Sequence, residues 1–185
     1  RGEAALRSWR QLEQRASSPS KLNAARLGIM RTGRDTGDYD LAGRAADALL
    51  ASSTLGSGNR TEATYTKAAA LSAQGDEAGA RKLWKSIADA TDELYGAIAA
   101  CSLAQSYLDS GDTDSARREA EALTGSGTPH AYWLARGFIV LSDVYAREGK
   151  TFEAREYLTA LNANYPGTET DIFDMIDTRL SKLKK

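Results

Sequence analysis

The sequence GDTDSA, residues 111–116, recurs in altered form at three other places in the chain. The related stretches are GDYDLA at 37–42, GDEAGA at 75–80 and GKTFEA at 149–154. Each stretch ends on an alanine, and these marker alanines, Ala42, Ala80, Ala116 and Ala154, stand 38, 36 and 38 residues apart. A period of this length is typical of an array of repeated units rather than of one closed core.

Each unit has the pattern of two helices joined by a tight turn. In the third unit an apolar stripe at helical spacing precedes the turn, formed by Ala97, Ala100, Leu103, Ala104, Tyr107 and Leu108. Gly111 suits the left-handed conformation that follows a helix end, and Asp112 can cap the next helix. After the turn, Ala116, Ala120 and Leu123 again share one face. The pattern predicts an all-α chain of helix pairs.

A second small residue stands twelve positions before three of the marker alanines: Ala68, Ala104 and Ser142. Two facing small side chains allow the two helices of a pair to approach closely at one crossing point. A larger side chain there would overpack the contact at a cost of about 1–3 kcal/mol. We therefore expect the helices to touch at the marker alanines.

These residues resemble the tetratricopeptide repeat (TPR). The resemblance rests on Leu103-Ala104, Tyr107, Ala116, Ala120 and Leu123, and on Leu141-Ser142, Tyr145, Ala154, Leu158, Leu161 and Pro166. It implies a right-handed superhelix (α-solenoid) of about four TPR-like helix pairs, at about 19–56, 57–92, 93–128 and 129–166. The first unit departs from the pattern, because its Leu27-Gly28 pair stands two residues too far from Ala42. That shift indicates either a longer first helix or a looser turn at 34–36.

The ends of the chain each predict one further helix. Residues 1–18 carry an apolar stripe that includes Trp9. The helix that follows should have Ser18 as its N-cap and Pro19 at its first helical position. We interpret this helix as the remainder of a preceding repeat or as a simple cap. Residues 167–185 predict a capping helix with a Thr168–Asp171 capping box. The apolar face of this helix consists of Ile172, Phe173, Ile176 and Leu180. Its C-terminal end carries Lys182, Lys184 and Lys185.

Composition disfavours several kinds of partner. The 24 basic and 25 acidic residues nearly cancel, whereas nucleic-acid binding normally requires a basic excess. No apolar run approaches the roughly 20 residues of a membrane-spanning helix, so we expect no direct membrane insertion. The chain begins at Arg1 without methionine, which we interpret as a trimmed or mature fragment that an export signal once preceded.

Catalytic patterns are missing from the sequence. Cys101 is the single cysteine and His130 the single histidine; we expect the first within a packed helix and the second in a loop between repeats. There is no glycine-rich phosphate loop, zinc-ligand spacing or nucleophile elbow. We therefore predict a protein that is not an enzyme and that has no cofactor or metal.

The TPR resemblance implies a concave groove lined by the first helix of each pair. The positions that match the family's groove, our candidates for partner binding, are Arg26, Glu62, Tyr65, Thr66, Ser102, Gln105, Asp109, Arg136, Asp143 and Arg147, with the more apolar Ala69, Ile98, Cys101, Ile139 and Val140 among them. The set lacks the paired lysines and asparagines with which co-chaperone TPR domains hold a terminal carboxylate. Trp133 is a further candidate for a partly exposed interface residue.

The leading hypothesis is a non-catalytic scaffold that binds a partner peptide or protein through this groove. One alternative is self-association through exposed end helices, with Leu6, Trp9 and Leu12 as the apolar face. Another is a docking or regulatory domain of a larger protein. The stretch LNANYPGTE, residues 161–169, resembles the repeat ends of bacterial envelope TPR proteins, which implies a periplasmic or envelope location, with the cytoplasm as the alternative.

Overall fold

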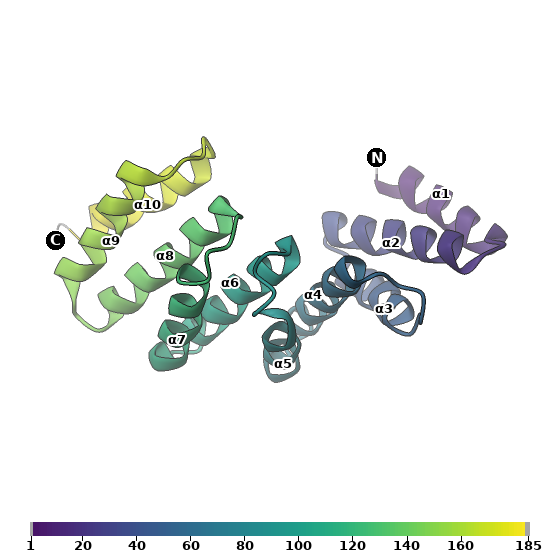
Figure 1. The fold of residues 1–185 in the computed structure, drawn as a ribbon, viewed down its shortest axis with the longest axis horizontal. Helices are drawn as coiled ribbons and strands as arrows, with labels where there is room; N and C mark the ends of the chain where they lie inside the picture. The colour runs from purple at the N-terminus through teal and green to yellow at the C-terminus, as the bar shows by residue number, and fades with distance from the viewer. Residues whose placement is uncertain (1, 184–185) are drawn as a thin grey trace. The chain divides into compact units, whose positions relative to one another are not determined.

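The chain is all-helical in the computed structural model, which describes residues 2–183 and contains ten helices and no strand within them. It divides into two compact units, Arg1–Ile87 and Ala88–Lys185. Within each unit every helix packs against the next helix in the sequence (Figure 1). The predicted all-α class is thus confirmed.

The helices of the first unit are α1 (Gly2–Arg15), α2 (Pro19–Thr36), α3 (Tyr39–Leu50), α4 (Ser57–Ala73) and α5 (Glu77–Ile87). Those of the second are α6 (Leu94–Asp109), α7 (Thr113–Thr124), α8 (Ala131–Arg147), α9 (Thr151–Asn164) and α10 (Thr170–Lys182). The repeated motif joins α2 to α3, α4 to α5, α6 to α7 and α8 to α9. Each unit therefore contains two whole helix pairs and one additional helix.

The four motif turns share one backbone conformation. The motif glycines Gly37, Gly75, Gly111 and Gly149 have φ values of 75°, 87°, 84° and 77°, in the left-handed region. The N–H of the next residue donates each time to the carbonyl five residues earlier, as in Asp38 to Gly33 (2.8 Å), Asp76 to Leu71 (2.9 Å), Asp112 to Tyr107 (3.0 Å) and Lys150 to Tyr145 (2.9 Å). This is the bond of a Schellman helix end, so one sequence motif specifies one turn.

Aspartate reinforces three of these turns. Asp38, Asp76 and Asp112 each accept a hydrogen bond from the backbone N–H three residues later, at 2.9, 2.9 and 3.0 Å. The carboxylate thereby satisfies a donor that the first helical turn leaves without an intrahelical partner. Lys150 stands in this position of the fourth turn and makes no such bond.

The marker alanines lie where the paired helices touch, as the sequence predicted. All four are fully buried, and the Ser142 hydroxyl donates to the carbonyl of Ala154 at 3.0 Å. In the first pair α2 is one residue longer than α4 and α8, and its turn has the conformation of the other three, so the looser turn is wrong. Gly33 makes the close approach there, because a Cβ atom on it would lie 2.9 Å from the Ala42 nitrogen.

The ends of the chain largely follow the predictions. Ser18 accepts a bond from the Lys21 N–H at the start of α2, with Pro19 in the first helical turn. The predicted capping box at Thr168 is wrong, because α10 begins at Thr170. Glu169 therefore takes the cap position, and its side chain makes no cap bond. The apolar face of α10 is confirmed by Ile172 and Ile176, which are fully buried. Lys182 is exposed, whereas Lys184 and Lys185 lie outside the described residues.

Candidate functional site

In the first unit, two of the predicted groove residues are buried. Glu62 on α4 is 2% exposed, and its carboxylate accepts bonds from Arg31 Nε (2.9 Å), Arg31 Nη2 (2.5 Å) and Arg34 Nη2 (3.2 Å) on α2. Thr66 is fully buried and accepts a bond from Arg34 Nη1 at 3.1 Å. A carboxylate can be buried at this depth because two guanidinium groups compensate its lost hydration. Glu62 and Thr66 therefore join α4 to α2, which differs from the open groove position expected of them.

The other three groove candidates of this unit, Arg26, Tyr65 and Ala69, are partly buried. Arg26 on α2 donates to the Glu13 carboxylate of α1 (3.2 Å) and to the Ala48 carbonyl of α3 (3.3 Å). Tyr65 lies on α4 beside Glu62 and Thr66. The Arg26 contacts are internal to the unit, so this candidate contributes to the packing of α1, α2 and α3.

The second unit places six groove candidates on two helices that pack directly against each other, α6 and α8. None of these six polar candidates is buried, whereas the apolar candidates of the same unit are all buried, which differs from the groove position expected of them: Ile98, Cys101, Ile139 and Val140. We call this surface the α6–α8 face, and it consists of Ser102, Gln105 and Asp109 on α6 and Arg136, Asp143 and Arg147 on α8. The Gln105 amide donates to the Asp109 carboxylate at 2.8 Å, and the Arg147 guanidinium donates to the Leu108 carbonyl. The face thus offers donors and acceptors that two rigid helices hold in place.

Aromatic rings and a third arginine border the α6–α8 face. The Arg136 guanidinium lies 5.9 Å from the ring centroid of Tyr132 and 5.8 Å from that of Trp133, which is partly exposed as expected. Asp143 accepts two bonds of 2.7 Å from Arg179 on α10, so its charge is already compensated. Arg136 and Arg147 are the cations of the face. Of its two carboxylates, Asp109 and Asp143, the charge of Asp109 is the less compensated.

The thiol and the imidazole lie in the surroundings that the sequence predicted. Burial raises the pKa of the Cys101 thiol to about 11, an effect that the nearby charge of Arg136 only partly opposes. The thiol is thus protonated at neutral pH and is a poor nucleophile. His130 lies in the connection before α8, where its Nε2 is 3.0 Å from the Asp92 carbonyl oxygen. Among residues 2–183, no three His, Cys, Asp or Glu side chains gather closely enough to bind a metal ion.

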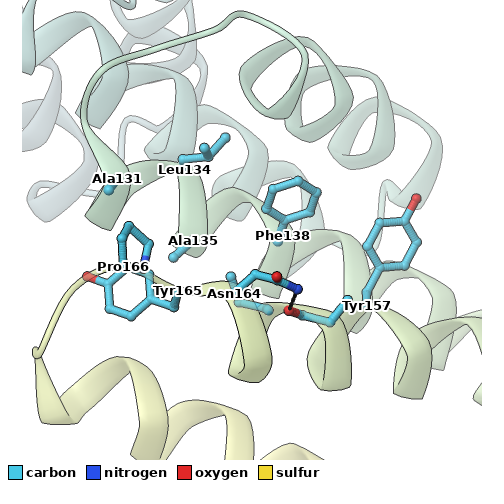
Figure 2. Close-up of a pocket in the computed structure, with 10 residues that line it drawn as sticks. Ala131, Leu134, Ala135, Phe138, Tyr157, Asn164, Tyr165 and Pro166 are labelled. Carbon is cyan, nitrogen blue, oxygen red and sulfur yellow. Dashed lines mark hydrogen bonds between the residues drawn. The ribbon is translucent and has the colours of Figure 1, made fainter.

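An apolar cavity of about 410 Å³, which the sequence pattern did not indicate, lies between α8 and α9 (Figure 2). It is lined by Ala131, Leu134, Ala135, Phe138, Tyr157, Ala160, Leu161, Asn164, Tyr165 and Pro166. Phe138 of α8 and Leu161 of α9 are two of its apolar residues. Both are only partly buried, which leaves apolar surface open to the cavity.

Aromatic side chains fix the walls of this cavity. Tyr157 stands between Phe138 and Tyr145, with ring centroids 6.1 and 5.4 Å away. The Tyr165 hydroxyl donates to the Glu169 carboxylate at 2.6 Å, and partial burial together with this bond raises the Tyr165 pKa to about 12. The two tyrosines of the lining, Tyr157 and Tyr165, are therefore neutral at physiological pH, so the cavity wall carries no charge.

The apolar face of α1 is partly used within its own unit. Trp9 packs so closely on α2 that a Cβ atom at Gly28 would lie 2.2 Å from its ring. Leu6 also packs against this core, although no residue of α1 is fully buried. Close packing with Trp9 explains why glycine is the residue at position 28. It also leaves less of α1 available for self-association than the sequence implied.

No helix of residues 2–183 is both long and apolar enough to span a membrane. The chain matches no protein-family model and no curated protein sequence. A functional conclusion must therefore be based on the geometry of the two surfaces, the α6–α8 face and the cavity between α8 and α9.

Proposed function

We propose that the chain is a non-catalytic protein-interaction module that binds a partner peptide or protein through the first helices of TPR-like pairs, wound as a right-handed α-solenoid. The observation that carries this proposal is the recurrence of one turn. Four motif glycines have φ between 75° and 87°, and each is followed by the same backbone bond. A fully buried alanine follows each glycine by five residues. Arrays of this type present rigid, extended binding surfaces.

The α6–α8 face is the part of the chain that best suits this function. Its six side chains reach solvent, whereas Val140 between them is buried in a core that it shares with Ala104 and Leu108 of α6. A preformed face limits the side-chain and backbone ordering that binding would otherwise cost. Glu62 and Thr66 of the first unit are covered by α2, which makes that unit the weaker candidate.

A charge reversal with a matched control tests the proposal. Asp109→Lys changes an exposed carboxylate in the last turn of α6 on the face, and Glu121→Lys makes the same change in the last turn of α7 outside it. Partners are recovered from an extract of the source cells by each immobilised protein and identified by mass spectrometry. We expect Glu121→Lys to recover the wild-type partner and Asp109→Lys to lose it.

The binding surface is then mapped by photo-crosslinking from benzoylphenylalanine at Gln105 and, as control, at Arg118, which is exposed on α7. A crosslink to the recovered partner from Gln105 alone supports the proposal. Equal loss of the partner in both lysine variants, or crosslinks from Arg118 alone, would contradict it.

A further inference from the structure

The cavity between α8 and α9 has counterparts in two other helix pairs. Five of its lining residues stand 38 positions after residues that line a cavity between α6 and α7: Ala100, Glu119, Ala122, Leu123 and Ser126. Eight stand 112 positions after residues that line a cavity beside α2 and α3: Pro19, Leu22, Asn23, Arg26, Ala48, Ser52, Ser53 and Thr54. These offsets equal the spacings of the marker alanines, 154 − 116 and 154 − 42. The three cavities therefore occupy one position of the repeat, which we call the notch.

The notch follows from the way the paired helices touch. The marker alanine brings the two helices together beside the turn, at the fourth residue of the second helix. The notch lies at the other end of the pair, between the start of the first helix and the end of the second. The two helices leave a cavity there, although Ala135 of α8 and Ala160 of α9 both line it.

In two of the pairs, the connection that precedes the first helix forms one wall of the notch. Ala16, Ser17 and Ser18 do so before α2, where a cavity of about 540 Å³ remains. Ala88, Asp89 and Thr91 do so before α6, where the remaining cavity is only about 100 Å³. The corresponding connection before α8, residues 125–130, contributes no lining residue to the fourth notch. That notch thus lacks the wall which the preceding connection supplies in the other two, and its non-helical lining residues are Tyr165 and Pro166 after α9.

The fourth notch also differs in chemistry. Phe138 takes the position of Arg26, whose guanidinium bonds to the Ala48 carbonyl in the first pair. All ten lining residues of the fourth notch are uncharged, and the Asn164 amide already donates to the Ala160 carbonyl at 2.7 Å. An apolar cavity of about 150 Å³ is enough to bind benzene. A notch of about 410 Å³ therefore has room for a leucine or phenylalanine side chain.

We infer that the notch between α8 and α9 binds an extended segment of a partner protein and accepts one leucine or phenylalanine side chain between Leu134, Phe138 and Leu161. The segment takes the place that the chain's own connections take in the other two notches. This site is separate from the α6–α8 face, and its occupation does not depend on that face.

The direct test uses N-acetylphenylalanine methylamide, which presents the side chain on a minimal peptide backbone, with N-acetylalanine methylamide as control. Each is titrated into the isotope-labelled chain and followed by NMR. We expect the phenylalanine probe to shift the signals of Leu134, Phe138 and Leu161, with a Kd on the order of 1 mM. The alanine probe should leave these signals unchanged. Shifts elsewhere, or none in the notch, would overturn the inference.

A pair of variants separates the notch from its surroundings. Ala160→Phe fills the notch from an exposed position of α9, and Thr159→Phe adds the same ring one residue away, where it does not line the notch. We expect Ala160→Phe to weaken probe binding by about tenfold or more and Thr159→Phe to change it less than about twofold. Asp109→Lys, which tests the α6–α8 face, should not affect the probe. Equal affinities for the two phenylalanine variants would refute the assignment to the notch.

The rival occupant is a second copy of this chain. Phe152 at the start of α9 is 71% exposed and is the most exposed large apolar side chain of the described residues. If sedimentation shows dimers or longer chains that Phe152→Ser abolishes, and the probe competes with that assembly, the occupant is a second copy and the inference of a different partner fails. A monomer that binds the probe supports it.

Discussion

Replacing Gly33 by alanine adds one methyl group at a close approach of α2 to the start of α3. A Cβ atom there would lie 2.9 Å from the Ala42 nitrogen, 3.0 Å from the Asp38 carbonyl oxygen and 3.2 Å from the Ala42 Cα. All three are backbone atoms, so no side-chain rotation can make room. Helix propensity alone would favour alanine by about 0.8–1.0 kcal/mol. Overpacking costs about 1–3 kcal/mol, so we expect the steric term to prevail and the unit to lose about 1 kcal/mol.

Gly58→Ala is the matched control, because it lies in α4 of the same unit and its Cβ would meet no atom within 4 Å. There the propensity term acts alone, and the unit should gain up to about 0.5 kcal/mol in the first helical turn. Urea unfolding followed by circular dichroism measures both effects. The midpoint should fall by about 0.5 M for Gly33→Ala and rise slightly for Gly58→Ala. A Gly33→Ala protein as stable as the wild type would refute the close approach of the helices.

Three further changes test other parts of the fold. Ala116→Phe should lower the unfolding free energy by about 1–3 kcal/mol, because Ala116 is fully buried. Glu121→Phe, at an exposed position, should change it by less than about 0.5 kcal/mol. Equal melting temperatures of the two variants would contradict the repeat register. Gly28→Ala should displace the Trp9 ring and shift its fluorescence; an unchanged spectrum would contradict the packing of α1 on α2. Burial favours the protonated Cys101 thiol in the folded state and so raises its pKa. The resulting contribution to the unfolding free energy is complete below pH 9 and is lost as the pH rises towards about 11. The unfolding free energy should therefore fall more steeply over that interval than in Cys101→Ala, and parallel curves would show that the thiol is not buried.

The turns could be predicted from the sequence because their requirements are local. Gly111 is needed for a backbone conformation that other residues rarely adopt, and Asp112 caps a helix start three residues away. A motif of six residues contains all of this information. The same is true of Ser18, which caps α2 through the N–H of Lys21.

The burial of Glu62 could not be predicted in this way. Its partners Arg31 and Arg34 come 31 and 28 residues earlier, and only the packing of α2 against α4 brings them to its carboxylate. A family register assigns a position to a helix face, but it does not say which neighbouring side chain covers that face. For this reason Glu62 and Thr66 were expected at an open surface.

The fourth notch could be predicted from the sequence only in part. A signal was present, because Phe138 stands at the repeat position that Arg26 and Ala100 take in other pairs. A change from arginine or alanine to phenylalanine at one position alters how the end of a helix pair is filled. Recognising its meaning required knowing that the connection before α8 leaves the notch open, and loop paths depend on contacts that single residues do not reveal.

The recurring turn has a consequence for how such a chain can change over time. Every bond that defines the turn joins residues of the same helix pair, as does the contact at the marker alanine. A gene duplication that copies one period of 36–38 residues would thus copy a complete turn together with its helix contact. The chain could gain or lose a pair in one genetic event, while residues at the notch, which the turn does not constrain, remain free to diverge.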